Sequence, residues 1–487
     1  MPFNMAWFKA RDEKRKAEEA AKLAAEGISK VNEEEKIEVS AQGTDDSGYY
    51  KFHKNSDPKN KHYFLCEELL VPHANSTDTQ RGNMWCNHTT QMVHLVKPEF
   101  PKVFTNFEDQ VGEYSVAYKK AKENFIIVDK IVKNDYNYDL IVKYSTGEYD
   151  IIHERTAVNI TEDYGYKLND CMGDLEPGDT VSKDTFLYKS DNYDDDGNFS
   201  YGVNLKAVYF PYMTSTYEDG IVISKSAAEK MTSYKVEKTM VSVNTNDILL
   251  NLYGDDYTYG SFPKVGQHID SKILVASRRK DKKTALYDLQ AKRIKDPDPE
   301  TDDIIYTGGG TVVDIDLFCN TPINDLRKRQ DIFNKEIIEL AEQNMEYWTK
   351  MAEALEKIIP CKELTDAEIR TEKSEFGHSC KHPIDPKDNP NKYTEELAYY
   401  WKLAHEYIDE KILWRSDGKS FDNFKIQFTI LKENPVVSGC KLTGRFGNKG
   451  VVSVILDDEK MPTTVDGERA EVCLNPLGKI YAQLKIS

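Results

Sequence analysis

The alternation of apolar and polar residues along the chain predicts a protein built mainly from strands. Residues 113–154 alternate aromatic or β-branched residues with polar ones and turn at Asn-Asp and Thr-Gly pairs, which is typical of an antiparallel meander. The runs IVIS (221–224), FKIQFTILKE (424–433) and VVSVIL (451–456) predict further strands, and more are expected within 235–275.

Two segments instead repeat their apolar residues at helical spacing. Residues 324–359 place apolar side chains on one helical face, and a second helix is expected over about 393–414. Joined by a polar, proline-containing segment, the two would form an αα-hairpin. Residues 6–26 alternate alanine with charge and predict an exposed N-terminal helix. The fold class expected is therefore α+β and multi-domain, mostly antiparallel β with a long αα-hairpin insertion. The apolar face of the first long helix comprises Ile332, Phe333, Ile337, Leu340, Ala341, Met345, Trp348, Ala352 and Leu355.

Composition narrows the class of protein. The 487 residues suffice for two to four domains, and no apolar run approaches the roughly 18 residues that span a membrane. The 65 basic and 83 acidic residues give a net charge of -18, which argues against a free-standing nucleic-acid binder but allows a local basic site. Eight scattered cysteines without a CxxC pair indicate reduced thiols. The cluster Cys361, His378, Cys380 and His382 matches no usual zinc spacing, so no metal site is expected there.

The segment from Asn434 to Leu456 departs from this acidic background. It contains no Asp or Glu, although these two residue types make up 83 of the 487 residues of the chain. It carries Lys441, Arg445 and Lys449 at intervals of four, among four glycines. Glycines allow a backbone to approach a ligand closely, and lysine and arginine bind phosphate, so the pattern favours a phosphate site. It is neither a Walker motif nor a dinucleotide fingerprint. Composition alone fits a mobile turn between two strands equally well.

Two further stretches concentrate polar side chains near apolar runs. In STYEDGIVIS, Glu218 and Asp219 precede an apolar strand. Neighbours on a strand point to opposite faces, so at most one of the two faces a given site unless the turn bends. In residues 76–93, Arg81, Asn87 and Gln91 lie among apolar residues.

Together and in this order, these stretches resemble a known family. GCKLTGRFGNKGVVSVI followed by KMPTTVDGERAEVCLNPLG resembles the K-x-x-G-R-H-G-N-K-G … M-P … D-G … N-P-L-G signature of the β subunit of multisubunit DNA-directed RNA polymerases, with Phe446 in place of the usual His. YFPYMTSTYEDGIVIS resembles that family's F-M-P-x-x-G-Y-N-F-E-D-A-I-x-I-S. DTQRGNMWCNHTTQMV resembles its D-A-N-R-x-x-M-x-x-N-M-Q-R-Q-A-V. The clear match is confined to stretches of this kind, but together they bracket most of the chain.

The resemblance implies a role for each matching residue. Lys441 and Lys449 match lysines that hold phosphates at the RNA 3′ end. Arg81 matches an arginine that reaches the triphosphate of the incoming nucleotide, and Asn87 and Gln91 match residues near the RNA backbone. Glu218 and Asp219 match an acidic pair close to a second metal ion. Arg445, in the same signature, is expected either to bind substrate or to pair with a carboxylate on a partner chain and set the shape of the loop. A further family arginine corresponds to Ala482, which leaves a second triphosphate contact in doubt.

The resemblance also implies an architecture and partners. The chain is similar to the C-terminal half of the β subunit, which contains a double-psi β-barrel, and it lacks the metal-binding DxDGD loop that belongs to the other large subunit. A β subunit divided in this way looks like the split polymerases of giant (jumbo) phages. The implied partners are an N-terminal β-like subunit, β′-like subunits that bind most of the Mg²⁺, a σ-like subunit, DNA template, RNA and nucleoside triphosphates, with no membrane. The implied location is the cytoplasm of an infected bacterium, and packaging in the virion stays open.

The motifs suggest a division of the chain into parts. Two alternatives to the split-polymerase interpretation stay open: a complete single-chain polymerase, and a non-catalytic phosphate-binding or scaffold protein. The expected parts are a charged helix and linker (1–47), regions near the active site (48–112 and 200–234), a β-rich insertion (113–199), a flap-like region (235–425) with the hairpin at 324–414, and a C-terminal barrel part (426–487) with the basic loop.

Overall fold

The computed structural model describes most of the chain from Glu67 onward. The expected N-terminal helix, the region around Ala482 and two of the cluster residues, His378 and Cys380, lie outside the described part. The described ranges are 67–159, 165–243, 247–255, 257–270, 273–279, 296–318, 335–363, 381–383, 391–408 and 424–475.

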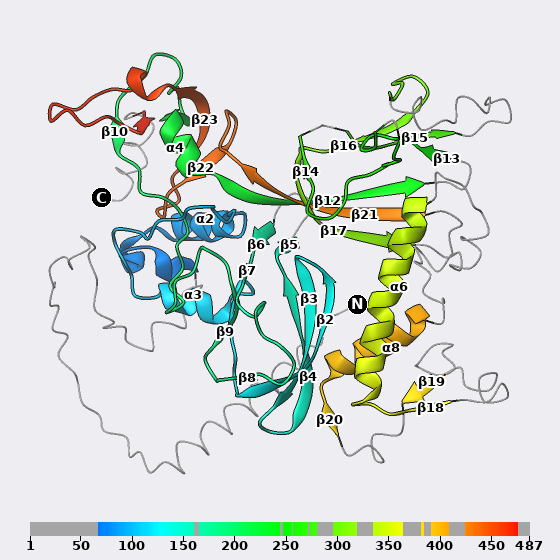
Figure 1. Ribbon diagram of the computed structural model, residues 1–487. Helices are drawn as coiled ribbons and strands as arrows, with labels where there is room; N and C mark the ends of the chain where they lie inside the picture. The colour runs from blue at the N-terminus through cyan, green and yellow to red at the C-terminus, as the bar shows by residue number, and fades with distance from the viewer. Residues whose placement is uncertain are drawn as a thin grey trace, which may run out of the picture.

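Most of the regular secondary structure in these ranges consists of strands, as the alternating pattern predicts. The strands form three main sheets (Figure 1). Most helices are short, and none in the described ranges is long and apolar enough to cross a membrane. The helical segments are η2 (Glu67–Leu70), η3 (Ala74–Ser76), α2 (Thr79–Thr89), α3 (Glu108–Tyr114), α4 (Lys225–Lys230), α6 (Lys335–Glu356), α8 (Glu395–Ile408) and η6 (Asp458–Lys460).

The first sheet joins two parts of the sequence that lie far apart along the chain. Its strand order is β10-β24-β11-β23-β22, in which β11 runs parallel to β23 and antiparallel to β24. Because β11 and β23 are neighbours and parallel, the residues that precede both strands meet at the same end of the sheet. The strands are β10 (Ala207–Tyr209), β24 (Val472–Leu474), β11 (Gly220–Ser224), β23 (Lys449–Leu456) and β22 (Lys441–Thr443).

The second sheet is antiparallel and holds a large apolar core. Ile426, Phe428 and Ile430 alternate along β21 and are fully buried, which places one face of the predicted strand in the core. The sheet has the order β12-β21-β17-β14, and a smaller sheet, β13-β15-β16, lies beside it (Figure 1). The strands are β12 (Ser233–Val243), β21 (Phe424–Asn434), β17 (Gly310–Phe318), β14 (His268–Ile269), β13 (Asp247–Leu249), β15 (Ile273–Arg279) and β16 (Asp303–Tyr306).

The third sheet confirms the antiparallel meander predicted within 113–154. Strands β2, β3 and β4 pair in sequence order. Leu140, Ile141 and Val142 on β3 are all buried, because Ile141 faces the helices α6 and α8 while its two neighbours face a separate core. The strands are β20 (Lys392–Tyr393), β4 (Glu148–Arg155), β3 (Asn137–Tyr144), β2 (Phe125–Asn134) and β8 (Thr180–Val181).

Short strands complete the described architecture. They form a three-stranded sheet, β1-β9-β7, and two pairs, β5-β6 and β18-β19. These strands are β1 (Tyr118–Lys120), β9 (Phe186–Lys189), β7 (Asn169–Asp170), β5 (Ala157–Asn159), β6 (Gly165–Lys167), β18 (Cys361–Glu363) and β19 (Lys381–Pro383).

Helices α6 and α8 correspond to the two predicted long helices, with shorter described bounds. They pack on each other, and Trp348 of α6 stacks on Tyr407 of α8 with ring centroids 4.4 Å apart. The described part of the connection contains β18, β19 and β20, so the helices are not joined by a single polar loop as the simple hairpin would be.

A buried carboxylate ties the third sheet to α6. Asp139 on β3 is fully buried and accepts hydrogen bonds from Arg155 Nη2 and His153 Nδ1, both at 2.6 Å, and from the Tyr347 hydroxyl. Burial alone would raise the pKa of Asp139, but these donors hold it below its ordinary value. The network fixes α6 on the sheet.

Glu154 on β4 is buried without such compensation, and its Oε1 has no hydrogen-bond partner. Burial, with Asp170 nearby, raises its pKa to about 8. The folded state therefore holds a proton here that the unfolded chain releases above about pH 4.5, so stability falls as pH rises from about 4.5 to about 8.

Replacing this carboxyl group by an amide should remove that pH dependence. We expect Glu154→Gln to gain stability relative to the unsubstituted chain by about 2 kcal/mol as pH rises from 6 to 8. Thermal melting of both forms at the two pH values checks this. The exposed Glu123→Gln is the matched control, and an equal change in both variants would contradict the assignment.

Candidate phosphate-binding site

The basic glycine-rich loop is the turn of a two-stranded ribbon at the edge of the first sheet. β22 and β23 pair antiparallel with Lys441 opposite Val451 and Thr443 opposite Lys449. Side chains two residues apart share a face, so Lys441, Thr443 and Lys449 project from the same side of the ribbon. Both lysines are exposed, and diagonal neighbours of this kind lie about 7–8 Å apart. The structure thus brings the two predicted phosphate ligands together.

Two glycines of this ribbon are required by close packing. Gly447 has φ of 66°, and a Cβ there would lie 2.6 Å from the carbonyl oxygen of Arg81 on α2. A Cβ on Gly450 would lie 2.4 Å from Cδ1 of Ile221 on β11. Any larger residue would push the loop away from both neighbours. The glycines therefore let the loop pack closely against both neighbours, which favours a fixed loop over the mobile turn that composition alone allowed.

Both arginines of the prediction bind the backbone of this chain. Arg81 Nη1 donates to the carbonyl of Gly447 at 3.0 Å. Arg445 Nη1 lies within hydrogen-bonding distance of the carbonyls of Leu70 (3.3 Å) and Val103 (2.8 Å) and of the Tyr201 hydroxyl (3.1 Å). Arg445 thus anchors the tip of the loop to the segment before α2 and to the residues that follow it. The substrate-binding role given to Arg445 stays a prediction, and its role in setting the loop's shape has direct geometric support.

Helix α2 lies along the loop and contacts it at two points two turns apart. Arg81 makes one contact, and His88 makes the second through a 2.9 Å hydrogen bond between its Nδ1 and Thr443 Oγ1. Burial first, and then the nearby charges of Lys441 and Lys449, lower the pKa of His88. Both effects favour the neutral form of the ring. Sequence reasoning missed His88 and Thr443.

The two remaining polar residues predicted on α2 and at its end are exposed. Asn87 lies on the solvent side of the helix, and Gln91 follows the helix by two residues. Gln91 lines a cavity of about 750 Å³ together with His88, Lys441 and Arg445. Gln91 and Lys441 thus line the same cavity, whereas no side-chain contact within the described part of the chain joins Asn87 to the loop.

The acidic pair lies at the same end of the sheet as Lys449. Gly220 pairs with Val451 in the parallel register of β11 and β23, and the backbone N–H of Val451 donates to the carbonyl of Asp219 at 2.9 Å. Glu218 has φ of 49°, so the chain bends at this residue and the strict alternation of a strand does not apply. Both carboxylates are exposed. A segment without acids is therefore placed beside two carboxylates from elsewhere in the chain.

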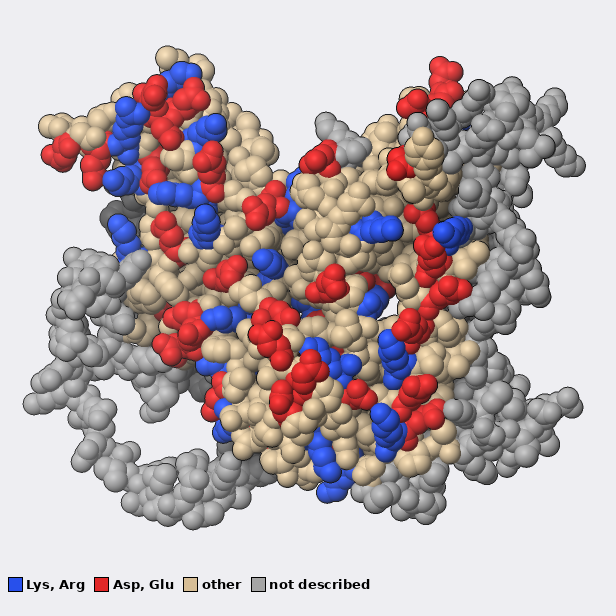
Figure 2. Space-filling view, viewed as in Figure 1, with Lys and Arg blue, Asp and Glu red and all other residues tan. Residues whose placement is uncertain are grey.

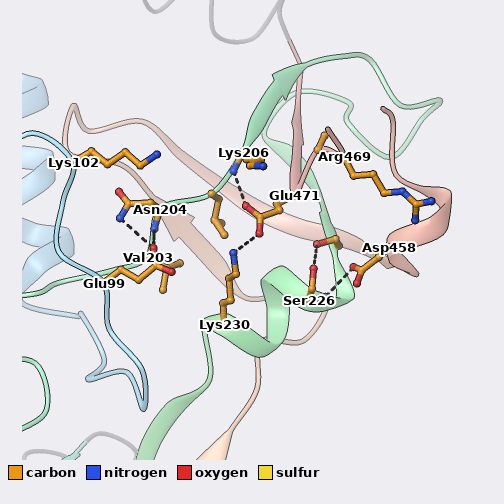
Figure 3. A pocket seen from close by; sticks show the side chains of 13 residues that line it. Glu99, Lys102, Val203, Asn204, Lys206, Ser226, Lys230, Asp458, Arg469 and Glu471 are labelled. Atoms are coloured by element: carbon orange, nitrogen blue, oxygen red, sulfur yellow. Dashed lines mark hydrogen bonds and ion pairs between the residues drawn. The ribbon is translucent and has the colours of Figure 1, made fainter. Parts of the chain in front are cut away.

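A second cavity lies at the opposite end of β11 and adjoins the first, since Glu99, Val203, Asn204 and Leu205 line both. It has a volume of about 790 Å³, and four basic and three acidic residues face it (Figure 3). Each of its three carboxylates has a hydrogen-bond partner within the chain. The pairs are Glu471 with Lys230 Nζ at 2.5 Å, Glu99 with the backbone N–H of Asn204 at 2.9 Å, and Asp458 with the backbone N–H of Ser226 at 3.0 Å.

Charge is otherwise mixed over the surface. Figure 2 shows acidic and basic side chains interspersed across the face viewed, without a continuous basic area. In the described ranges no group of three or more His, Cys, Asp or Glu could hold a metal ion, and no disulfide joins the cysteines described there. The arrangement on the ribbon is therefore a local cationic site with two carboxylates at its edge.

Comparison with known protein families shows to which family the chain belongs. The model of RNA polymerase Rpb2, domain 6, matches residues 179–479, which is more than half of the chain. The chain belongs to this family. The match spans both the acidic pair before β11 and the two lysines of the ribbon, and it ends close to the last described residues.

Individual relatives of this domain agree. The chain is 24% identical over 475 residues to a DNA-directed RNA polymerase subunit beta from Flavobacterium psychrophilum, and 25% identical over 481 residues to one from Porphyromonas cangingivalis. Each alignment covers 84% of this chain and 36% of the relative. The chain thus spans about a third of the length of the curated relatives it matches.

Proposed function

We propose that this chain is the C-terminal part of the β-type subunit of a split, phage-type DNA-directed RNA polymerase, and that it holds the phosphates of the RNA 3′ end and the incoming nucleotide. The observation that carries the proposal is the fixed placement of Lys441 and Lys449 on one face of the ribbon, beside Glu218 and Asp219. The reaction, DNA-directed RNA synthesis, is inferred from the match to RNA polymerase Rpb2, domain 6, over 179–479 and from the similar bacterial DNA-directed RNA polymerase subunits beta. The first sheet is the candidate for the double-psi β-barrel of that family.

The chemistry explains why these side chains are needed. Nucleotidyl transfer asks the protein to position the reacting groups and to stabilise charge. An attraction between one lysine and one phosphate at about 4 Å and an effective dielectric constant of about 20 is worth roughly 4 kcal/mol before desolvation. Two lysines on a ribbon fixed by Gly447 and Gly450 can hold successive phosphates in register. Arg81, on α2 beside the same loop, would contact the triphosphate in this proposal.

The family implies Mg²⁺, and this chain has residues that could supply only a few of the ligands of such an ion. Mg²⁺ in such sites takes one or two carboxylates, with waters and substrate phosphates for the rest. Glu218 and Asp219 are two exposed carboxylates at one turn, so they would hold one ion only with help from substrate and partner subunits. When bound, the ions would stabilise the attacking and leaving oxygens.

Partner chains follow from the same proposal. The main metal ligands would come from β′-like subunits with a DxDGD loop, and an N-terminal β-like chain would supply the rest of β. A σ-like subunit would select promoters. The chain would act in the cytoplasm of the infected host.

Co-purification tests this proposal. A tagged form of the chain, isolated from infected cells, should carry with it a chain with a DxDGD loop, and the complex should extend RNA on a DNA template. If the tagged chain were isolated alone and extended RNA, the split-subunit account would fail. If it were isolated alone and inactive, the scaffold alternative would be favoured.

Arg81→Ala should raise the apparent KM for nucleotides more than it weakens template binding. In this proposal the guanidinium contacts the triphosphate, while other parts of the complex hold the duplex. Because Arg81 also donates to Gly447, some loss of kcat is expected as well. Arg81→Lys, which keeps the charge but not the planar fork, is the matched variant and should show a smaller rise. Initial rates over a nucleotide series, with template affinity measured separately, check this. Impaired template binding with an unchanged KM would count against the assignment.

A further inference from the structure

The hydrogen bond between His88 and Thr443 lies at the centre of the proposed site. Thr443 is opposite Lys449 in the ribbon and two residues from Lys441. His88 is only 8% exposed, and its Nδ1 is 2.9 Å from Thr443 Oγ1. A single side-chain contact therefore joins α2 to the strand positions that carry both lysines.

The protons of this contact can be assigned from the surrounding acceptors. Thr443 Oγ1 is 2.9 Å from the carbonyl oxygen of Asn448 and 3.2 Å from that of Gly444. A carbonyl only accepts, so the hydroxyl proton of Thr443 is used there, and Nδ1–H of His88 donates to Oγ1. The result is a chain of hydrogen bonds from α2 through Thr443 to the end of the loop just before Lys449.

This pair departs from the motifs that the chain resembles. The motif that residues 78–93 resemble has Met at the position of His88, and the basic signature leaves the position of Thr443 unspecified. A methionine would fill the same buried space without a donor for Thr443. The contact is thus an addition to the family pattern and replaces a purely apolar one.

We infer that His88 is a positioning residue, which acts through Thr443 to fix Lys441 and Lys449 relative to α2 and its Arg81. This inference rests on the proposed function. Arg81 holds the loop at Gly447, and His88 holds it at Thr443, so the two contacts together prevent the ribbon from sliding or rotating along the helix. Without the second contact the lysines keep their charge but lose their register with the phosphates.

The test uses the complete polymerase complex, with the rate of single-nucleotide addition measured over a series of nucleotide concentrations and normalised to assembled enzyme. His88→Met, which restores the residue of the family motif, should lower kcat by about three- to tenfold, the range expected for one lost hydrogen bond. The nucleotide KM should change less than about twofold, because triphosphate contacts are not removed. Thr443→Val should lower kcat at least as much, because it also removes the hydroxyl that donates to the carbonyl of Asn448.

Two further variants separate positioning from general stability. The double variant His88→Met/Thr443→Val should be no slower than Thr443→Val alone, because Thr443→Val already removes the contact that His88→Met breaks. His88→Asn, whose amide nitrogen can take the place of Nδ1, should recover most of the rate. The control is His94→Met: His94 makes a comparable 2.8 Å bond to Ser190 without contacting the loop. It should lower the melting temperature of the complex and leave kcat per assembled enzyme unchanged.

The outcomes are distinguishable from failure of the proposed function. A normal kcat in His88→Met, or effects of the two single variants that multiply in the double variant, would overturn the positioning role even if lysine variants were inactive. Near-normal rates in the lysine variants would instead overturn the proposed function itself.

Discussion

Replacing Lys441 or Lys449 by alanine should slow RNA elongation about 10²-fold or more while leaving assembly intact. Both side chains are exposed on one face of the ribbon, so their truncation opens no cavity in a core. Each substitution removes a positive charge that holds phosphates in register, and a displacement of reacting groups by about 1 Å can cost on the order of 10²-fold. Elongation rates of purified complexes, normalised to assembled enzyme, measure the effect.

The matched control is an exposed lysine elsewhere in the same sheet region. Lys460, after β23, pairs with Asp457 at 2.6 Å and lies at the opposite end of that strand. Lys460→Ala should leave the rate unchanged. Near-normal elongation by the double variant Lys441→Ala/Lys449→Ala would remove the basis of the phosphate-holding role.

Arg445→Ala should impair the order of the loop and the assembly of the complex at least as much as catalysis. Its Nη1 lies within reach of two carbonyls and the Tyr201 hydroxyl, so the substitution leaves partly buried acceptors without this donor. A loss of about 2–4 kcal/mol of local stability is expected for hydrogen bonds from a charged donor in a partly buried position. Hydrogen exchange of the amides in residues 441–456 should accelerate accordingly.

Tyr201→Phe is the informative companion to this variant. It removes one acceptor but keeps the ring beneath the guanidinium, whose centre is 5.9 Å from the ring centroid. Its effect should therefore be much smaller than that of Arg445→Ala. Unchanged hydrogen exchange together with a catalytic loss in Arg445→Ala would show that the guanidinium acts on substrate instead.

Much of the secondary structure could be predicted from the sequence, because the spacing of apolar residues shows the period of a strand or of a helix. Alternation of apolar and polar residues marked the region of β2 to β4 and the first part of β21, and helical spacing marked α6, whose Ile337, Trp348 and Leu355 are buried. The burial of β3 on both faces was not predictable, because it depends on α6 and α8 packing from the far side. The strands between the two helices were also not predicted, since short two- and three-residue strands carry too few residues to show a period.

The same limit applies to the site. The absence of acids in 434–456 and the interval of four between cations were visible in the sequence. The parallel pairing of β11 with β23, which sets Asp219 beside Gly450, joins segments far apart in the chain and follows from tertiary structure alone. The partners of Arg445 and the contact of His88 with Thr443 likewise have no local pattern. The only trace of the latter in the sequence is the departure from the Met of the family motif.

The central claim is that this ribbon contacts the RNA 3′ end, and a site-directed crosslink tests it most directly. An RNA with a photoreactive group on its last internucleotide phosphate would be annealed to a DNA template, bound by the complete complex, irradiated and analysed by peptide mapping. We expect the label on this chain, within residues 441–449, and its loss from those residues when the group is moved well upstream, toward the RNA 5′ end. Labelling confined to other chains, or to residues outside 441–449 and the neighbouring helix α2, would contradict the account.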